Sequence, residues 1–288
     1  MSIQLGAVLI SFFIKCSVVY ASSLNVTVPV LSYRAAAFDY QYRLLEFALE
    51  KSGYQYQLKK VTLDTSQARL ETMLNKGDQV NVYWMGTSIE KEKQLIPVRI
   101  PILRGLLGHR VFIIHKKDQE RFNQIKTIDD LKKMVAVQGI GWSDIKILKN
   151  ASLKTIARKY KTIFDIINAG DRVDYFPRGV NEAWDEVEQF KTTSPNITVE
   201  SKILLVYPFA IFFFVSPNHP EIAQALTKGL KKAYKDGSFM GFFSGHPSIV
   251  ALFEKANIEG RLKLVINNPL MSQETMSIPG EYWHTKQQ

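Results

Sequence analysis

The chain alternates short apolar runs with amphipathic segments along its N-terminal part. The expected elements there are strands at Leu24–Val30, Tyr54–Val61 and Gln79–Trp84, and helices at Tyr40–Ser52 and Thr65–Lys76. Each helical pattern stops at a glycine, Gly53 or Gly77, and glycine is a typical helix C-cap. This βαβαβ order predicts a parallel sheet with right-handed crossovers.

The middle of the chain repeats this alternation. Its expected elements are a strand at Leu107–His115, a helix opening at Thr127, a strand at Met134–Gln138, a helix from about Ser143, a helix at Leu153–Ala169, a strand at Val173–Phe176 and a helix capped by Asn181. The run ILLVYPFAIFFFV at 203–215 is broken by Pro208 and is too short to cross a bilayer as a helix. It therefore predicts a strand in the core of the first lobe. Helices at His219–Lys235 and Pro247–Ala256 are expected after it.

These patterns predict an α/β fold with two Rossmann-like lobes, of which the first is discontinuous. The first lobe is expected to comprise residues 22–112 and 210–288, and the second lobe residues 113–209. The two linking segments are expected near Val111–Lys116 and Tyr207–Phe212. A length of 288 residues agrees with roughly two domains.

The N-terminus has the pattern of a secretory signal peptide. The apolar run Leu5–Ile14 is followed by Val19-Tyr20-Ala21, a small-x-small cleavage pattern, so residues 1–21 are interpreted as the signal. An uncleaved N-terminal anchor is the alternative. Cleavage would remove Cys16, the one cysteine, and an exported protein without cysteine favours a bacterial periplasm.

The charge and the remaining motifs exclude several classes of function. The formal net charge of +10 attracts anions, but the lysines are scattered and form no nucleic-acid-binding module. No two of the five histidines have metal-ligand spacing, and no GxSxG turn is present. Gly139-Ile-Gly lacks the third glycine of a dinucleotide fingerprint. No catalytic residue, cofactor or metal is therefore predicted.

Three loops suit a small polar ligand, because ligands of open α/β sheets bind beyond the carboxyl ends of the strands. The candidate ligand-binding residues in and around these loops are Trp84, Thr87, Ser88, Trp142, Ser143, Arg178 and Glu182. Arg104, in a predicted loop before Gly105, adds positive charge. Arg110 is expected on the linking strand, facing either the cleft or the solvent.

Arg178 is the central candidate. It is expected in a turn between a strand and a helix, where Pro177 restricts the backbone and Gly179 frees it. A guanidinium held there can grip a carboxylate or phosphate with two hydrogen bonds. The alternative is an internal ion pair with Glu182 or Asp185 that fixes the turn.

The order of elements and the segment Thr127-Ile-Asp-Asp-Leu-Lys-Lys-Met-Val-Ala-Val-Gln-Gly-Ile-Gly resemble the extracytoplasmic solute-binding proteins of family 3. The resemblance spans nearly all of residues 24–265 and implies the type II periplasmic-binding-protein fold. It also implies that two lobes close around a small solute, often a polar amino acid, and present it to a membrane permease or a sensor.

One position departs from that family. Its amino-acid binders typically place a carboxylate-clamping arginine a few residues after the serine or threonine that follows the third strand. Glu92 stands near that position here. Standard amino-acid recognition is therefore doubtful, and Arg178 or Arg104 could supply the charge instead.

The leading hypothesis is a periplasmic, monomeric, non-catalytic binding protein. It would trap an anionic or zwitterionic solute, amino-acid-like or an organic acid, for an ABC-type permease or sensor. The alternatives are an enzyme on the same fold, of dehydratase or lyase type, with Glu182 or Asp174 as the general acid or base, and a ligand-sensing partner of a membrane receptor.

Overall fold

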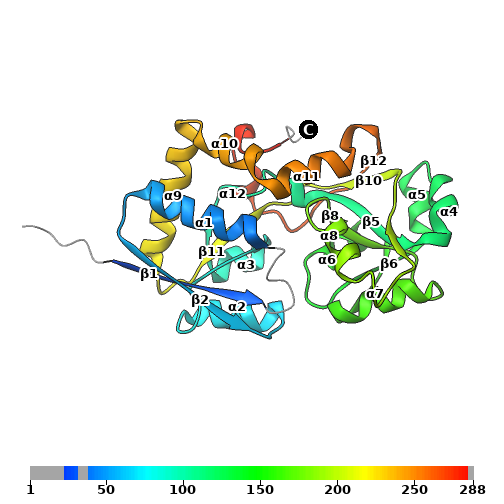
Figure 1. The fold of residues 1–288 in the computed structure, drawn as a ribbon, viewed down its shortest axis with the longest axis horizontal. Coiled ribbons are helices and arrows are strands. Elements are labelled where there is room, and N and C mark those ends of the chain that lie inside the picture. Colours follow the sequence, from blue (N-terminus) through cyan, green and yellow to red (C-terminus); the bar gives the residue numbers. More distant parts are fainter. Residues whose placement is uncertain (1–22, 32–37, 285–288) are drawn as a thin grey trace, which may run out of the picture.

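The computed structural model describes residues 23–31 and 38–284. The signal peptide expected at residues 1–21 lies outside the described residues. Figure 1 shows two lobes side by side, and strand β1 belongs to the first of them. Within the described ranges, no helix has the length and apolar character needed to span a membrane.

The first lobe combines two small sheets with helices packed around them. Its elements are β1 (Leu24–Leu31), α1 (Asp39–Ser52), β2 (Tyr56–Leu63), α2 (Gln67–Lys76), β3 (Val82–Gly86), α3 (Ile89–Gln94), β4 (Ile96–Val98), β11 (Ile211–Val215), α9 (Pro220–Lys235) and α10 (Ser238–Gly245). Strand β1 pairs in parallel with β2, and β11 lies antiparallel between β3 and β4. The side chain of Asn81 ties the two sheets together by hydrogen bonds to the backbone of Asn25 and Thr27, at 2.7 Å each.

The second lobe is built around β5. Its elements are β5 (His109–His115), α4 (Gln119–Asn123), α5 (Ile128–Lys132), β6 (Val135–Gly139), α6 (Asp144–Asn150), β7 (Lys154–Arg158), α7 (Tyr160–Ala169), β8 (Phe176–Gly179), α8 (Ala183–Gln189), β9 (Ile197–Val199) and β10 (Ile203–Val206). Strand β5 pairs antiparallel with β8, β9 and β10, whereas β6 and β7 pair in parallel.

The C-terminal part of the chain returns to the junction of the lobes. It contains α11 (Pro247–Ala256), β12 (Leu262–Val265) and α12 (Gln273–Met276). Strand β12 pairs in parallel with β10, so these residues join the sheet of β5. Short 3-10 helices occur at Leu106–Gly108, Lys116–Asp118, Ile258–Gly260 and Gly280–Tyr282. The lobe boundaries given above stay a prediction.

Two segments at the junction of the lobes lie close to each other. The amide of Tyr207, just after β10, donates to the carbonyl of Gly108, just before β5, at 3.0 Å. A Cβ on Gly108 would lie 1.9 Å from the carbonyl oxygen of Tyr207, so only glycine permits this approach. Val111 of β5 pairs with Arg178 of β8 a few residues later.

Three local predictions were wrong. The helix expected at Leu153–Ala169 is a strand, β7, followed by α7, since residues 154–158 pair with β6. The run at 203–215 forms two strands in different sheets, β10 and β11, on either side of Pro208. Helix α8 has Glu182 rather than Asn181 as its N-cap residue.

The core of the first lobe depends on a close contact between α1 and α9. Leu44, Leu45 and Ala48 of α1 are fully buried, and Gly229 of α9 lies against the backbone of Ala48 and Ser52. An added Cβ at Gly229 would lie 1.8 Å from the carbonyl oxygen of Ala48. The helices can approach this closely only because Gly229 has no side chain.

Gly229→Ala should therefore lower the free energy of unfolding by about 1–3 kcal/mol, because the methyl group forces the two helices apart. The matched control is Gly241→Ala in α10, where nothing lies within 4 Å of the added Cβ. That control should be neutral or gain up to about 1 kcal/mol from helix propensity. Urea denaturation of both variants measures the difference, and equal stability would contradict the proposed steric role.

Candidate functional site

A cleft at the junction of the lobes contains most of the candidate residues. It encloses about 530 Å³ of space, part of it open to solvent. Its polar lining residues are Gln67, Arg110, Ser143, Asp144, Arg178 and Glu182. Its other lining residues are Phe38, Tyr83, Trp84, Met85, Gly86, Leu107, Trp142, Phe209 and Ile211. The charged lining side chains come from β5, α6, β8 and the residue that begins α8, whereas β3 and β11 supply mainly apolar surface.

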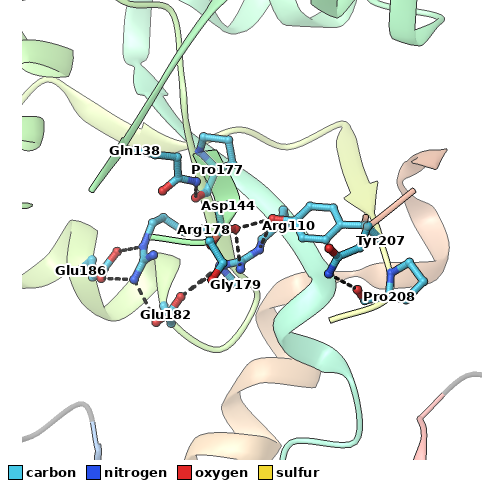
Figure 2. A network of polar contacts seen from close by, with 12 residues as sticks. Arg110, Gln138, Asp144, Pro177, Arg178, Gly179, Glu182, Glu186, Tyr207 and Pro208 are labelled. Carbon is cyan, nitrogen blue, oxygen red and sulfur yellow. Dashed lines mark hydrogen bonds and ion pairs between the residues drawn. The ribbon is translucent and has the colours of Figure 1, made fainter. Parts of the chain in front are cut away.

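Arg178 lies inside strand β8, paired with Val111 of β5, and not in the predicted turn. It is 2 % exposed, and its guanidinium donates to both carboxylate oxygens of Glu186 at 2.6 and 2.7 Å. A second ion pair, at 2.9 Å, joins it to Glu182 (Figure 2). The predicted internal pair with Glu182 is thus present, and Glu186 takes the place expected for Asp185.

Two aromatic rings and the two carboxylates hold Arg178 in its charged form. Its guanidinium carbon lies 4.7 Å from the ring centre of Trp142 and 5.0 Å from that of Phe176, which favours a cation. Burial by itself lowers the pKa of Arg178, but the charges of Glu182 and Glu186 outweigh it and the pKa is raised. Arg178 is therefore a permanent positive charge in the cleft wall.

The residues around Arg178 explain how it is fixed. Gln138 at the end of β6 donates to the carbonyl of Pro177 at 2.9 Å and so holds the strand that carries it. The amide of Gly179 donates to Glu182 at 3.2 Å, which folds the start of α8 back over β8. A Cβ on Gly179 would lie 2.5 Å from Asn181 Oδ1, so a larger residue would push the side chain of Asn181 aside.

Arg110 is the second buried guanidinium of the cleft, and the sequence left its direction open. It is 1 % exposed and lies on β5. Its Nη2 pairs with Asp144 at 2.7 Å, and its Nη1 lies 3.6 Å from Glu182. Its Nε donates to the hydroxyl of Tyr207 at 2.9 Å, and that hydroxyl donates in turn to Asp144 (Figure 2).

Arg110, Asp144 and Tyr207 thus form a chain of contacts that joins β5, α6 and the segment after β10. Burial by itself lowers the pKa of Arg110. The neighbouring carboxylate of Asp144 has the opposite effect and outweighs it, so the pKa of Arg110 is raised. Burial also raises the pKa of the Tyr207 hydroxyl well above its usual value, so the hydroxyl keeps its proton. No sequence motif marks Arg110, Asp144 and Tyr207 as a group, because they are brought together only by the fold.

The remaining candidates divide between the cleft and its surroundings. Trp84 is 1 % exposed, and its indole nitrogen has no hydrogen-bond partner among the described residues. Ser143 accepts a hydrogen bond at 2.9 Å from Lys91 of α3, so it joins the two lobes across the cleft. Thr87 and Ser88 do not line this cleft: Thr87 donates to Glu92 at 2.5 Å, and Ser88 caps α3.

Two other candidates are bound elsewhere. The guanidinium of Arg104 donates to the carbonyls of Glu281 and Trp283 at 2.9 and 2.7 Å, so it fixes the C-terminal segment outside the cleft. Asp174, the alternative catalytic carboxylate, pairs with Arg121 and accepts from the amide of Val135 at 2.6 Å. It is not a lining residue of the cleft.

Glu92 also makes its polar contacts within the protein, away from the cleft. It is buried beside α12 and accepts hydrogen bonds from Thr87, Ser272 and Thr275 at 2.5 to 2.7 Å. Arg99 pairs with it at 3.0 Å. Burial raises the pKa of Glu92, but these hydrogen bonds and the arginine charge outweigh it, and the pKa is lowered.

The stability of the protein should fall at acid pH partly through Glu92. The pKa of Glu92 is lower in the folded protein than its ordinary value of about 4.5. Glu92 therefore stabilises the fold fully above pH 4.5, and this stabilisation is lost as the pH falls through the pKa of the folded state. Glu92→Gln should therefore cost most near neutral pH and progressively less below about pH 4.5. Urea denaturation across this range measures the difference, and the exposed Glu254→Gln serves as control. A cost for Glu92→Gln that does not change with pH would contradict the assignment.

Removing the carboxylate that holds Arg178 should be far more costly. Glu186→Gln leaves a buried guanidinium under-compensated, which should lower the free energy of unfolding by about 3–5 kcal/mol. Glu188→Gln is the matched control, because that side chain is 73 % exposed and should change stability by less than about 0.5 kcal/mol. Thermal and urea unfolding compare the two variants, and similar losses would show that the buried pair is unimportant.

Comparison with known proteins shows the fold. No protein-family model matches the chain, and neither does any curated protein. Among solved structures, an ancestral arginine-binding protein bound to arginine is similar at 17 % identity, with a TM-score of 0.54 over 77 % of this chain and 97 % of that one.

Two further solved structures have a similar fold. An amino acid ABC transporter substrate-binding protein from Streptococcus pneumoniae, bound to L-arginine, has 14 % identity and a TM-score of 0.55 over 76 % of this chain and 91 % of its own. A chain from work on glutathione import via GshT and the cystine ABC importer TcyBC of Streptococcus mutans has 14 % identity and a TM-score of 0.55, over 88 % of this chain and 100 % of its own. The chain therefore has the fold of the substrate-binding proteins of amino-acid ABC transporters, as its resemblance to family 3 predicts.

Proposed function

We propose that this protein is a periplasmic solute-binding protein that traps a small solute with an oxyanion group between its lobes. The solute is amino-acid-like or an organic acid, and the bound form is presented to an ABC-type permease. The periplasmic location rests on the predicted signal peptide and on the extracytoplasmic family that the sequence resembles. The shared fold supports binding and transport rather than catalysis.

Two buried guanidinium groups in the wall of the cleft carry this proposal. Arg110 and Arg178 both line the cleft, and Arg178 Nη1 donates no hydrogen bond within the described part of the chain. Arg110 Nη1 makes an ion pair with Glu182 at 3.6 Å and no closer hydrogen bond to a described residue. Two guanidinium groups held on paired strands suit a carboxylate or a phosphate.

The surroundings of these donors support tight binding. Glu182, Glu186 and Asp144 fix both guanidinium groups before any solute arrives, so little side-chain entropy is lost on binding. The opposite wall is aromatic and apolar and can exclude water from the solute. A solute that touches both walls favours the closed arrangement of the lobes.

Arg110→Lys tests the assignment without removing the charge. Lysine keeps the cation but loses the planar fork, so the affinity for the solute should fall at least about tenfold. Carboxylates and phosphates are first screened by thermal shift, and calorimetry then measures Kd for the wild type and the variant. Arg121→Lys is the control, because Arg121 is 52 % exposed and pairs with Asp174 outside the cleft. Unchanged affinity in Arg110→Lys would overturn the assignment.

A further inference from the structure

The C-terminal segment returns from the sheet of β5 to the first lobe by a short path. At its start, the amide of Ile266 donates to the carbonyl of Val206 on β10 at 3.0 Å. At its end, the carbonyl of Leu270 accepts from the amide of Ile89, the first residue of α3, at 3.0 Å. Residues 267–269 alone separate these two contacts, and a chain reaches at most about 3.6 Å per residue. The return path therefore ties α3 to β10 with little slack.

The same path holds the linking segment between β10 and β11. The side-chain amide of Asn268 donates to the carbonyl of Pro208 at 2.8 Å, and its oxygen accepts from the amide of Leu270 at 2.9 Å. Pro208 lies between the end of β10 and the start of β11, so it belongs to the chain that passes from one sheet to the other. A hinge rotation in this linking segment moves Pro208 relative to β10, and Asn268 opposes that movement.

The far end of the segment binds the chain that leads into β5. Arg104 donates to the carbonyls of Glu281 and Trp283. Its own carbonyl accepts from the amide of His284 at 2.7 Å. The ring of Trp283 lies over Gly105, where an added Cβ would be 2.5 Å from it. Arg104 has a φ of 51°, a left-handed conformation that residues other than glycine rarely adopt. These contacts hold the linking segment before β5 in one strained conformation.

Between these two ends the segment binds α3 through its side chains. Ser272 and Thr275 donate to the two carboxylate oxygens of Glu92 at 2.7 Å each. The residue before Glu92 is Lys91, whose ammonium group donates to Ser143 of the second lobe at 2.9 Å. The segment therefore fixes the helix that faces the second lobe across the cleft.

We propose that residues 266–284, here called the brace, limit how far the two lobes open. A hinge works by dihedral changes in the segments that link two lobes. The brace binds both linking segments, at Pro208 and at Arg104, and it also binds α3 of the first lobe. Wide opening then requires that the contacts at one of these three places break. The proposal involves no solute, so its failure would leave the proposed function intact.

A slackened brace tests the proposal. About eight Gly and Ser residues inserted after the exposed Asn267 lengthen the return path without replacing any of its residues. Arg69→Cys in α2 and Lys149→Cys in α6 place one spin label on each lobe, and Cys16→Ser leaves these as the only thiols. Double electron–electron resonance then measures the distance between the labels. The insertion should add longer distances and raise the mean by more than about 2 Å, the scale of a hinge rearrangement.

Two matched variants complete the test. The same insertion after Thr192, in an exposed turn of the second lobe, should leave the distance between the lobes unchanged. Trp283→Ala keeps the return path at its native length but removes the contact with Gly105, so it should also lengthen the distance. A label pair inside the second lobe, Lys133→Cys with Lys149→Cys, shows whether that lobe keeps its shape in every variant.

Unchanged distances between the lobes in the Asn267 insertion would overturn the brace. A native protein that samples the longer distances as often as the slackened one would do the same. If the insertion disturbs the label pair inside the second lobe, Trp283→Ala decides alone, and an unchanged distance in that variant overturns the brace as well.

Discussion

Two buried guanidinium groups set the main constraint on this structure. Arg178 and Arg110 are 2 % and 1 % exposed, and a buried charge is tolerated only with close carboxylates around it. Asp144 at the start of α6, together with Glu182 and Glu186 at α8, supplies them. The two helices and the strands β5 and β8 must therefore meet at one place, and that place is the wall of the cleft. The same contacts that stabilise the second lobe also fix both guanidinium groups in the wall of the cleft.

The two lobes therefore present different surfaces to the cleft. The second lobe presents a rigid polar surface, and the first presents a largely apolar one with Trp84 and its aromatic neighbours. Contacts between α3 and the start of α6 already join the lobes across the cleft, through Lys91 with Ser143 at 2.9 Å and Glu90 with Lys146 at 3.1 Å. A solute adds to this closure only to the extent that it contacts both surfaces.

The C-terminal segment binds Glu92 and Arg104, two charged residues at positions where the sequence alone suggests ligand contacts. Glu92 accepts hydrogen bonds from Ser272 and Thr275, and Arg104 donates to the backbone carbonyls of Glu281 and Trp283. Both stand in loops or helix starts, where ligand contacts are also common. These C-terminal partners are more than 170 residues away along the chain, so local sequence could not separate an internal role from a ligand contact.

The sequence by itself determined the α/β alternation, most helix positions and the two lobes, because apolar periodicity and glycine stops act locally. Only the tertiary structure decided that Arg178 lies in a strand, that residues 154–158 form β7, and that Arg110, Asp144 and Tyr207 meet. Strand pairing and buried ion pairs join residues that are distant in the chain. Their stabilising energy depends on partners that cannot be identified from the local sequence pattern. A cleft lined by such pairs can be recognised only in the folded structure.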